Sequence, residues 1–127
     1  MNNLLLMGSA LVSYLNTNGT VDFYYRKAKQ SVQPPFGVVS FIAGTDDYTF
    51  DSNGFNGEWL IKVVGRKTFP ETTIEEYNET HDIIQDAPLT LTGNTLMRFR
   101  RISLIEYQDP EDFWNIGGIY NFDTWKT

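Results

Sequence analysis

Residues 95–126 read TLMRFRRISLIEYQDPEDFWNIGGIYNFDTWK, and this stretch decides the fold class. It contains a β-rich segment at 95–107, an acidic turn at 109–112 and a second β-rich segment at 118–126. The two segments follow each other without a helix between them, so the chain lacks the regular β-α-β alternation of a doubly wound parallel sheet. A mainly antiparallel sheet is therefore predicted.

The remaining elements are predicted from hydrophobic periodicity and turn signals. Working outward, they are a helix at 3–17, strands at 20–26, 37–44 and 58–67, and a second helix at 72–86. The apolar strand at 37–44 is expected to be covered on both faces, and 44–57 is expected to be a long turn-rich loop. We therefore predict one domain over residues 1–127, of the α+β class, with a mainly antiparallel β-sheet and two packed α-helices.

Each predicted helix has an apolar stripe along one face. In the first helix the stripe includes Leu11 and Leu15, and Asn18-Gly19 supplies a left-handed stop. In the second helix the stripe consists of Ile74, Tyr77, His81 and Ile84, and His81 is the chain's only histidine. We interpret the first helix as docked on the sheet, because its polar side lacks the Lys and Arg of a membrane-surface anchor.

Composition bounds the class of protein. The chain has 127 residues, 41% of them hydrophobic, which is enough for one core and one domain. The net charge of −6 disfavours general attraction to nucleic acid. The absence of cysteine excludes disulfides, Cys-ligated metals and a thiol nucleophile. The short apolar run near the N-terminus lacks the basic start of a secretory signal, and no segment has the length of a membrane span.

Few residues in the sequence offer catalytic chemistry. His81 lies on an apolar stripe, where a structural role beside Tyr77 is favoured over that of a catalytic base. The carboxylate pairs Asp46-Asp47 and Glu111-Asp112 lie in turns, which explains them without acid–base catalysis. A calcium site in the 44–57 loop is disfavoured because the EF-hand order of ligands is missing. We predict no catalytic, cofactor-binding or metal-binding residue, no cofactor, and no enzymatic activity.

The candidate functional residues are therefore those of an interface. They fall into three groups, namely the loop residues Tyr48, Phe50, Asp51 and Phe55, the basic cluster Arg98, Arg100 and Arg101, and the C-terminal strand residues Tyr120, Phe122 and Trp125. Simpler roles remain open for each group. The loop aromatics could fold back onto the sheet, the arginines could pair with acidic residues across the strands, and Trp125 could cap the domain's own core.

The basic cluster lies where the phase of the 95–107 strand slips, which predicts a β-bulge near Arg100 and Arg101. On a regular strand Arg98 and Arg100 face one way and Arg101 faces the other. If the cluster does not pair within the chain, its partner is expected to be acidic, and another copy of this acidic chain is one such partner.

A series of segments, in this order, resembles the tail completion or tail terminator family of tailed bacteriophages. The segments are the N-terminal helix, QPPFGVVSF at 33–41, DYTFD at 47–51, WLIKV at 59–63, the acidic helix at 72–86, the acidic turn at 109–112, and YNFDTW at 120–125. The resemblance covers almost the full chain as a pattern of elements. The second helix is rich in Glu, Asn and Thr, whereas family members usually carry an Ala-rich one, so the partner of its outer face is left open.

The resemblance implies a structural virion protein of the phage neck, assembled in the host cytoplasm. Such a protein forms a ring, commonly a homohexamer, that caps the finished tail tube and presents a surface to the head connector or stopper protein. DNA passes through the ring without being read, and no membrane is involved. The alternatives are a head-closure or tail-tube subunit of the same particle, a non-viral soluble binding module, or a small enzyme.

Overall fold

The computed structural model describes residues 3–19, 21–26, 33–47, 54–67, 69–85 and 94–126. Along the chain, the elements are α1 (Asn3–Asn18), β1 (Phe23–Tyr25), β2 (Phe36–Asp47), β3 (Gly54–Gly65), α2 (Pro70–Gln85), β4 (Asn94–Gln108) and β5 (Trp114–Lys126). None of the helices in these ranges is long and apolar enough to cross a membrane.

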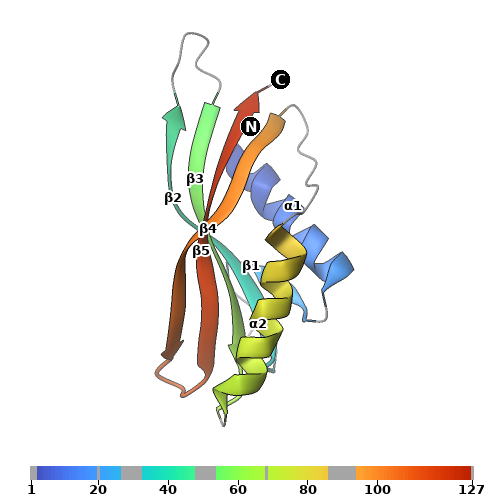
Figure 1. The fold of residues 1–127 in the computed structure, drawn as a ribbon, viewed down its shortest axis with the longest axis vertical. Coiled ribbons are helices and arrows are strands. Elements are labelled where there is room, and N and C mark those ends of the chain that lie inside the picture. The colour runs from blue at the N-terminus through green and yellow to red at the C-terminus, as the bar shows by residue number, and fades with distance from the viewer. Residues whose placement is uncertain are drawn as a thin grey trace.

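The strands form one five-stranded sheet in the order β1-β2-β3-β5-β4. Only the short pair β1 and β2 is parallel, and the three other pairs are antiparallel. Figure 1 shows a strongly twisted sheet with α1 and α2 on the same face. The α+β class with a mainly antiparallel sheet and two packed helices is thus confirmed.

The core lies between that face of the sheet and the two helices. Leu11 and Leu15 of α1 are fully buried, which confirms the predicted stripe. At the centre, Trp59 packs its ring against Phe41 and Phe122, with centroid distances of 5.4 and 6.0 Å. The Trp59 indole Nε1 is buried and has no hydrogen-bond partner within the described residues, so this side chain contributes through packing alone.

A glycine sets how closely α1 approaches this core. A Cβ at Gly8 would lie 2.6 Å from the Tyr25 ring and 3.1 Å from Trp59. The helix therefore tolerates the intrinsic cost of a mid-helix glycine in exchange for close contact with both aromatic rings. The helix ends as predicted, where the Gly19 amide donates to the Leu15 carbonyl at 2.8 Å.

The strands differ from the predicted ones in length. Strand β1 covers only three residues of the predicted 20–26, whereas β5 begins at Trp114, four residues before the predicted 118. Strands β2 and β3 pair as far as Asp47 opposite Gly54, so the predicted 44–57 loop is largely a hairpin. Cross-strand pairing thus overrides the turn preference of the Asn-Gly and Asp residues in this stretch.

The prediction that the 37–44 strand is covered on both faces holds only for its first part. Val38 and Val39 point to opposite faces and both are buried, with the helices covering the face that carries Val39 and Phe41. Ile42, at a bulge of β2, is 45% exposed. The continuous apolar character of this strand thus reflects a surface as well as a core.

The acidic turn between β4 and β5 is held by one of its own carboxylates. Asp109 accepts backbone hydrogen bonds from Glu111 and Phe113, both at 3.0 Å, and a side-chain bond from Asn115 at 3.1 Å. Burial would raise the pKa of Asp109, but these hydrogen bonds to Asn115, Phe113 and Glu111 outweigh it and lower the pKa. The predicted turn is confirmed, and Asp109 has a structural role in it.

Candidate functional site

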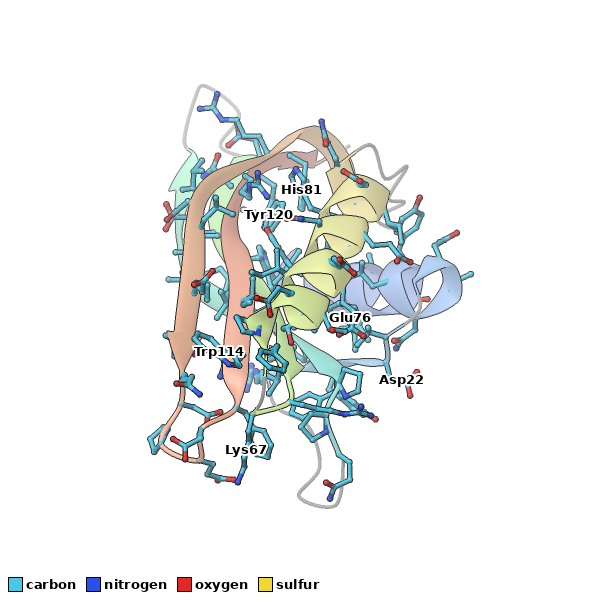
Figure 2. All side chains as sticks on the ribbon, turned by 60° about the horizontal axis from the view of Figure 1, so that its bottom comes forward. Asp22, Lys67, Glu76, His81, Trp114 and Tyr120 are labelled. Carbon is cyan, nitrogen blue, oxygen red and sulfur yellow. The ribbon has the colours of Figure 1, made fainter. Side chains whose placement is uncertain are left out.

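A chain of polar side chains runs between the C-terminal half of α2 and strands β5 and β4. The hydroxyls of Tyr77 and Tyr120 lie 2.7 Å apart, and His81 Nδ1 lies 2.8 Å from the Tyr120 hydroxyl. Arg101 donates to the Tyr77 hydroxyl at 3.4 Å. Figure 2 shows His81 reaching from the helix toward Tyr120 on the strand beneath it. We call Tyr77, His81, Arg101 and Tyr120 the tyrosine–histidine–arginine cluster.

The local sequence explains why these four side chains meet. Tyr77 and His81 are one turn apart on α2, so they lie on the same helix face, and their rings pack at 6.4 Å as predicted. Arg101 and Tyr120 are register partners on β4 and β5. A Cβ at Gly118 would collide with the Tyr77 hydroxyl and lie 2.8 Å from Arg101 Cδ, so the glycine provides the space that the cluster needs.

Arg101 sets the first direction in this chain of hydrogen bonds. Arg101 has only donors, so the Tyr77 oxygen accepts from it. If Tyr77 then donates to Tyr120, and Tyr120 donates to His81 Nδ1, each hydroxyl proton has an acceptor. This arrangement leaves neutral His81 with its proton on Nε2, the nitrogen that is not engaged with Tyr120.

The electrostatics of the cluster agree with a neutral histidine beside a permanent cation. Burial lowers the pKa of His81, nearby Arg101 lowers it further, and Asp82 partly opposes the shift. The hydrogen bond to Tyr77 raises the pKa of Arg101. Burial, followed by the contact with Tyr77, raises the pKa of Tyr120 far above its ordinary value. The tyrosine hydroxyl is therefore a poor general acid at neutral pH.

Next to this cluster is an open hollow of about 410 Å³ between α2 and β4. It is lined by His81, Gln85, Phe99, Arg100 and Arg101. No carboxylate lines it, and neither Arg100 nor Arg101 forms an ion pair within the described residues. The register partners of these two arginines are Asn121 and Tyr120, so cross-strand pairing with acidic residues does not account for them. Only Arg98 has an acidic register partner, Asp123.

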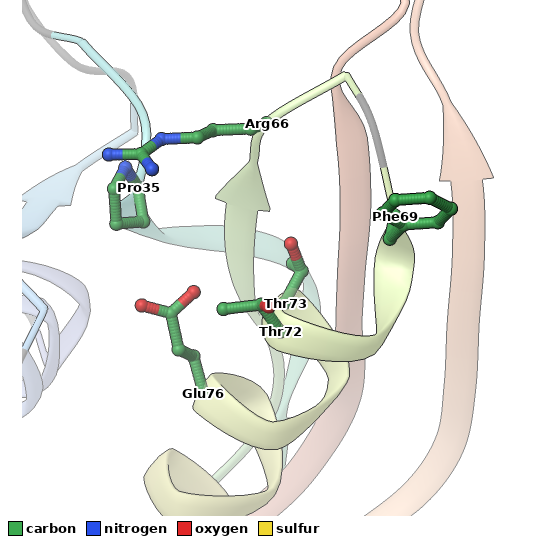
Figure 3. A pocket seen from close by; sticks show the side chains of 6 residues that line it. All are labelled: Pro35, Arg66, Phe69, Thr72, Thr73 and Glu76. Carbon is green, nitrogen blue, oxygen red and sulfur yellow. The ribbon is translucent and has the colours of Figure 1, made fainter.

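A second pocket, of about 280 Å³, lies at the other end of α2. Figure 3 shows Arg66 and Glu76 at its rim together with Pro35, while Phe69 stands to one side. Burial raises the pKa of Glu76, Arg66 opposes this shift, and Glu79 adds to it. This pocket therefore has both a cation, Arg66, and a carboxylate, Glu76, in its lining. The described lining of the first hollow has arginines but no carboxylate.

The structure places the predicted interface residues in different environments. Tyr48, Phe50 and Asp51 lie outside the described residues. The backbones of Phe55, Arg98 and Trp125 lie in β3, β4 and β5, where Trp125 pairs with Gly54 and Thr95. Arg100 is exposed and Arg101 is partly buried, on opposite faces of β4 as predicted, and a bulge follows Arg101.

The expectation that Tyr120 and Phe122 belong to an interface is corrected. Both side chains are fully buried in the domain's own core, and Phe99 stacks on both, with ring centroids 5.3 and 6.5 Å apart. Alternation along β5 turns them toward the helices, whereas Asn121 and Asp123 face the other side and are only partly buried. Neither aromatic ring presents a surface to another molecule.

Sequence reasoning missed the exposed apolar residues of the two outer long strands. Ile42 on β2 is 45% exposed, and Ile102 and Leu104 on β4 are 48% and 64% exposed. Ile42 and Ile102 each occupy a bulge, where the strand alternation that guides such a prediction is interrupted. The phase slip near Arg100 and Arg101 was the available signal for the second of these positions.

Two stretches of strand edge are unpaired in the part of the chain that the structure describes. Strand β1 pairs with β2 only at Gly37–Val39, and the outer edge of 42–47 has no strand partner among the described residues. Strand β4 is the last strand of the described sheet, and its outer edge also has none. The register connects Ala43 through Glu58 and Asn121 to Arg100, so these two free edges lie at the same level of the sheet.

The comparisons with known proteins add no identity to this description. The sequence matches no family profile and no curated protein. Among the described residues, no group of three or more His, Asp or Glu side chains is arranged to hold a metal ion.

Proposed function

We propose that this protein is a structural subunit of a ring in the neck of a tailed bacteriophage, a tail terminator that caps the tail tube. The observation that carries the proposal is the pair of free strand edges at one level of the sheet, each with an exposed isoleucine, Ile42 on β2 and Ile102 on β4. Free edges with exposed apolar side chains favour pairing with another chain.

The strand directions support edge-to-edge joining of identical copies. Strands β2 and β5 run one way, and β3 and β4 run the other way. If β4 of one copy lies beside β2 of the next in the same orientation, the new pair is antiparallel, as in the rest of the sheet. Because the two joined edges differ, the contact is heterologous, and repetition of such a contact gives a ring or a filament.

The charges along the two edges are complementary in sign. Arg98, Arg100 and Arg101 of β4 lie level with Thr45, Ala43 and Phe41 of β2, and the acidic residues Asp46 and Asp47 follow directly at the end of β2. Complementary charges steer association and help to fix the register of a contact. The helices of every copy would lie on one face of such a ring, and the uncovered sheet faces would form the other.

The resemblance to the tail terminator family supplies the biological setting. It supports a ring, commonly of six copies, in contact with the tail-tube protein on one side and the head connector or stopper protein on the other. DNA would pass through the lumen, and the net charge of −6 agrees with a lumen that does not hold phosphates. The site of action would be the virion, after assembly in the host cytoplasm, with no catalytic role.

Light scattering after size-exclusion chromatography, together with negative-stain images, tests this proposal. We expect a multiple of the 14.6 kDa monomer and single flat rings. Long tubes would favour the tail-tube alternative, and a monomer at all concentrations would favour a free binding module; either result contradicts the proposal.

Variants at the two edges sharpen the test. Ile102→Lys and Ile42→Lys should each give monomers, because a charge on the edge opposes strand pairing. Phe69→Ser is the matched control, since Phe69 is 75% exposed but lies in the connection between β3 and α2, away from both edges. A control that dissociates as readily as the edge variants would show that the edges are not the contact.

A further inference from the structure

The hollow beside the tyrosine–histidine–arginine cluster has a one-sided chemistry. Its described lining includes His81, Gln85, Arg100 and Arg101. Arg101 faces α2 together with Phe99, whereas the Arg100 side chain lies on the opposite face of β4. The Arg101 guanidinium has only donors, and the amide of Gln85 adds two more. With Tyr120 donating to Nδ1, neutral His81 contributes an N–H at Nε2. Arg101, Gln85 and His81 thus supply hydrogen-bond donors to one volume, and none of its described lining residues is a carboxylate.

The cluster also holds part of this lining in place. Arg101 is fixed by the Tyr77 hydroxyl and lies over the Tyr77 ring at 6.0 Å. The His81 ring packs at 5.8 Å against the Tyr120 ring and is hydrogen-bonded to its hydroxyl. Tyr77 and Tyr120 are themselves buried, so the two donors rest on rigid groups. Donors that are positioned in advance lose less conformational entropy when they bind a ligand.

We propose that this hollow binds an oxyanion, a phosphate or carboxylate group, through Arg101, His81 and Gln85. The planar guanidinium group of Arg101 suits two-point contact with such a group, and Phe99 adds an apolar part to the lining. Among the described lining residues no carboxylate balances the charge of Arg101. This site does not depend on the proposed ring.

The single histidine makes the test direct, because the imidazole protons of His81 give one resolved NMR titration curve. The groups that face His81 in the described residues are Asp82 on α2, Tyr77, Tyr120 on β5, and Arg101 on β4. The titration is carried out on the full chain with inorganic phosphate and, at the same ionic strength, with chloride alone. We expect phosphate to raise the pKa of His81 by about one unit relative to chloride.

Variants separate this site from a general salt effect. Arg101→Gln should raise the phosphate concentration needed for the response about tenfold or more, as loss of one charged hydrogen bond predicts. Arg100→Gln is the matched control, because it removes the same charge from the opposite face of β4. Arg66→Gln is a second control, because Arg66 lies at the other end of α2 beside Glu76. A His81 pKa that is the same in phosphate and chloride, or a response unchanged by Arg101→Gln, overturns the proposal.

Two sources of the oxyanion are distinguished by repeating the titration on the Ile102→Lys variant and on diluted protein. If the natural ligand is a free phosphate-like anion, both samples respond to phosphate as the parent does. If it is a carboxylate of a neighbouring copy, assembly itself raises the pKa of His81, and phosphate has an effect only in the monomer. Both outcomes support an oxyanion site, and failure of the ring leaves the first of them intact.

Discussion

The middle of the sheet and its two outer long strands are built for different purposes. Trp59 on β3 and Tyr120 on β5 have no exposed surface and lie beneath both helices. Ile42 on β2 and Ile102 on β4 leave about half of their surface exposed, next to backbone that has no partner strand in the described residues. The comparison indicates that the inner strands determine the stability of the domain, whereas the outer strands determine what it joins.

The largest effect should come from the central tryptophan. Trp59→Ala removes a fully buried ring that packs on Phe41, Phe122 and Tyr25, and we expect it to lower the free energy of unfolding by about 3–5 kcal/mol. Urea denaturation measures the loss. Trp59→Phe should cost much less, because it keeps an aromatic ring and also removes the Nε1 donor that has no partner among the described residues. Equal losses in the free energy of unfolding for the two variants would show that the volume of the aromatic ring does not determine the stability at this position.

A smaller loss of stability is expected at Gly118, the β5 glycine that lies against the tyrosine–histidine–arginine cluster. Gly118→Ala places a methyl group against the Tyr77 hydroxyl and Arg101, and overpacking of this kind costs about 1–3 kcal/mol. Thermal unfolding and the His81 NMR signal should change together, because the methyl displaces the hydroxyl that orders the cluster. An unchanged His81 signal in a destabilised variant would contradict the role given to Gly118.

The buried hydroxyl of Tyr120 should contribute a comparable or slightly smaller amount. Tyr120→Phe leaves the Tyr77 hydroxyl and His81 Nδ1 without their partner, and we expect a loss of about 1–2 kcal/mol in urea denaturation. The matched control is Tyr107→Phe on β4, because Tyr107 is 42% exposed and, among the described residues, its hydroxyl is hydrogen-bonded to Lys62 alone, at 3.1 Å. The control should change stability by no more than about 0.5 kcal/mol. Equal effects at the two positions would refute the distinction between the inner and outer strands.

The sequence alone predicted the features that depend on local periodicity. Both helices, the Tyr77–His81 pair and the bulge after Arg101 were found because each leaves a repeating or broken pattern in adjacent residues. The extension of β2 and β3 to Asp47 and Gly54 was missed, because it results from cross-strand pairing that competes with local turn preference.

The candidate site was not predictable as a unit. Arg101 was expected to meet an acidic residue or a partner molecule, but it donates to Tyr77, a residue on a helix that precedes β4 in the chain. Arg100 and Arg101 were singled out as a cluster, but their association with His81 and Gln85 depends on how α2 lies across the sheet. The sequence spacing of these residues does not predict how α2 packs on the sheet. It also does not predict that the two free edges lie at the same level.

A pH effect should be smaller than the packing effects. The folded state lowers the pKa of His81 below its ordinary value near 6.5, so the unfolded chain takes up a proton first as the pH falls. The contribution of neutral His81 is therefore complete above that ordinary value and is lost as the pH falls through the lowered one. His81→Gln should flatten the decline of stability in this window, measured by urea denaturation at a series of pH values. A parent and variant with parallel curves would contradict the assignment.

The smallest effect on stability and the largest on assembly are expected at the outer strands. Ile102→Lys changes a half-exposed side chain, so the free energy of unfolding of the monomer should shift by no more than about 0.5 kcal/mol. Its effect on the joining of copies should be complete at dilute concentration.

Hydrogen exchange at the backbone amides of 42–47 and 95–101 tests the edge-to-edge contact most directly. In the assembled parent protein these amides should exchange slowly, because each edge is paired with the other edge of a neighbouring copy. In the monomeric Ile102→Lys variant those amides that point away from the adjoining strand should exchange quickly, while the amides of β3 and β5 stay protected. Edge amides that exchange equally fast in the assembly and in the monomer would contradict the account.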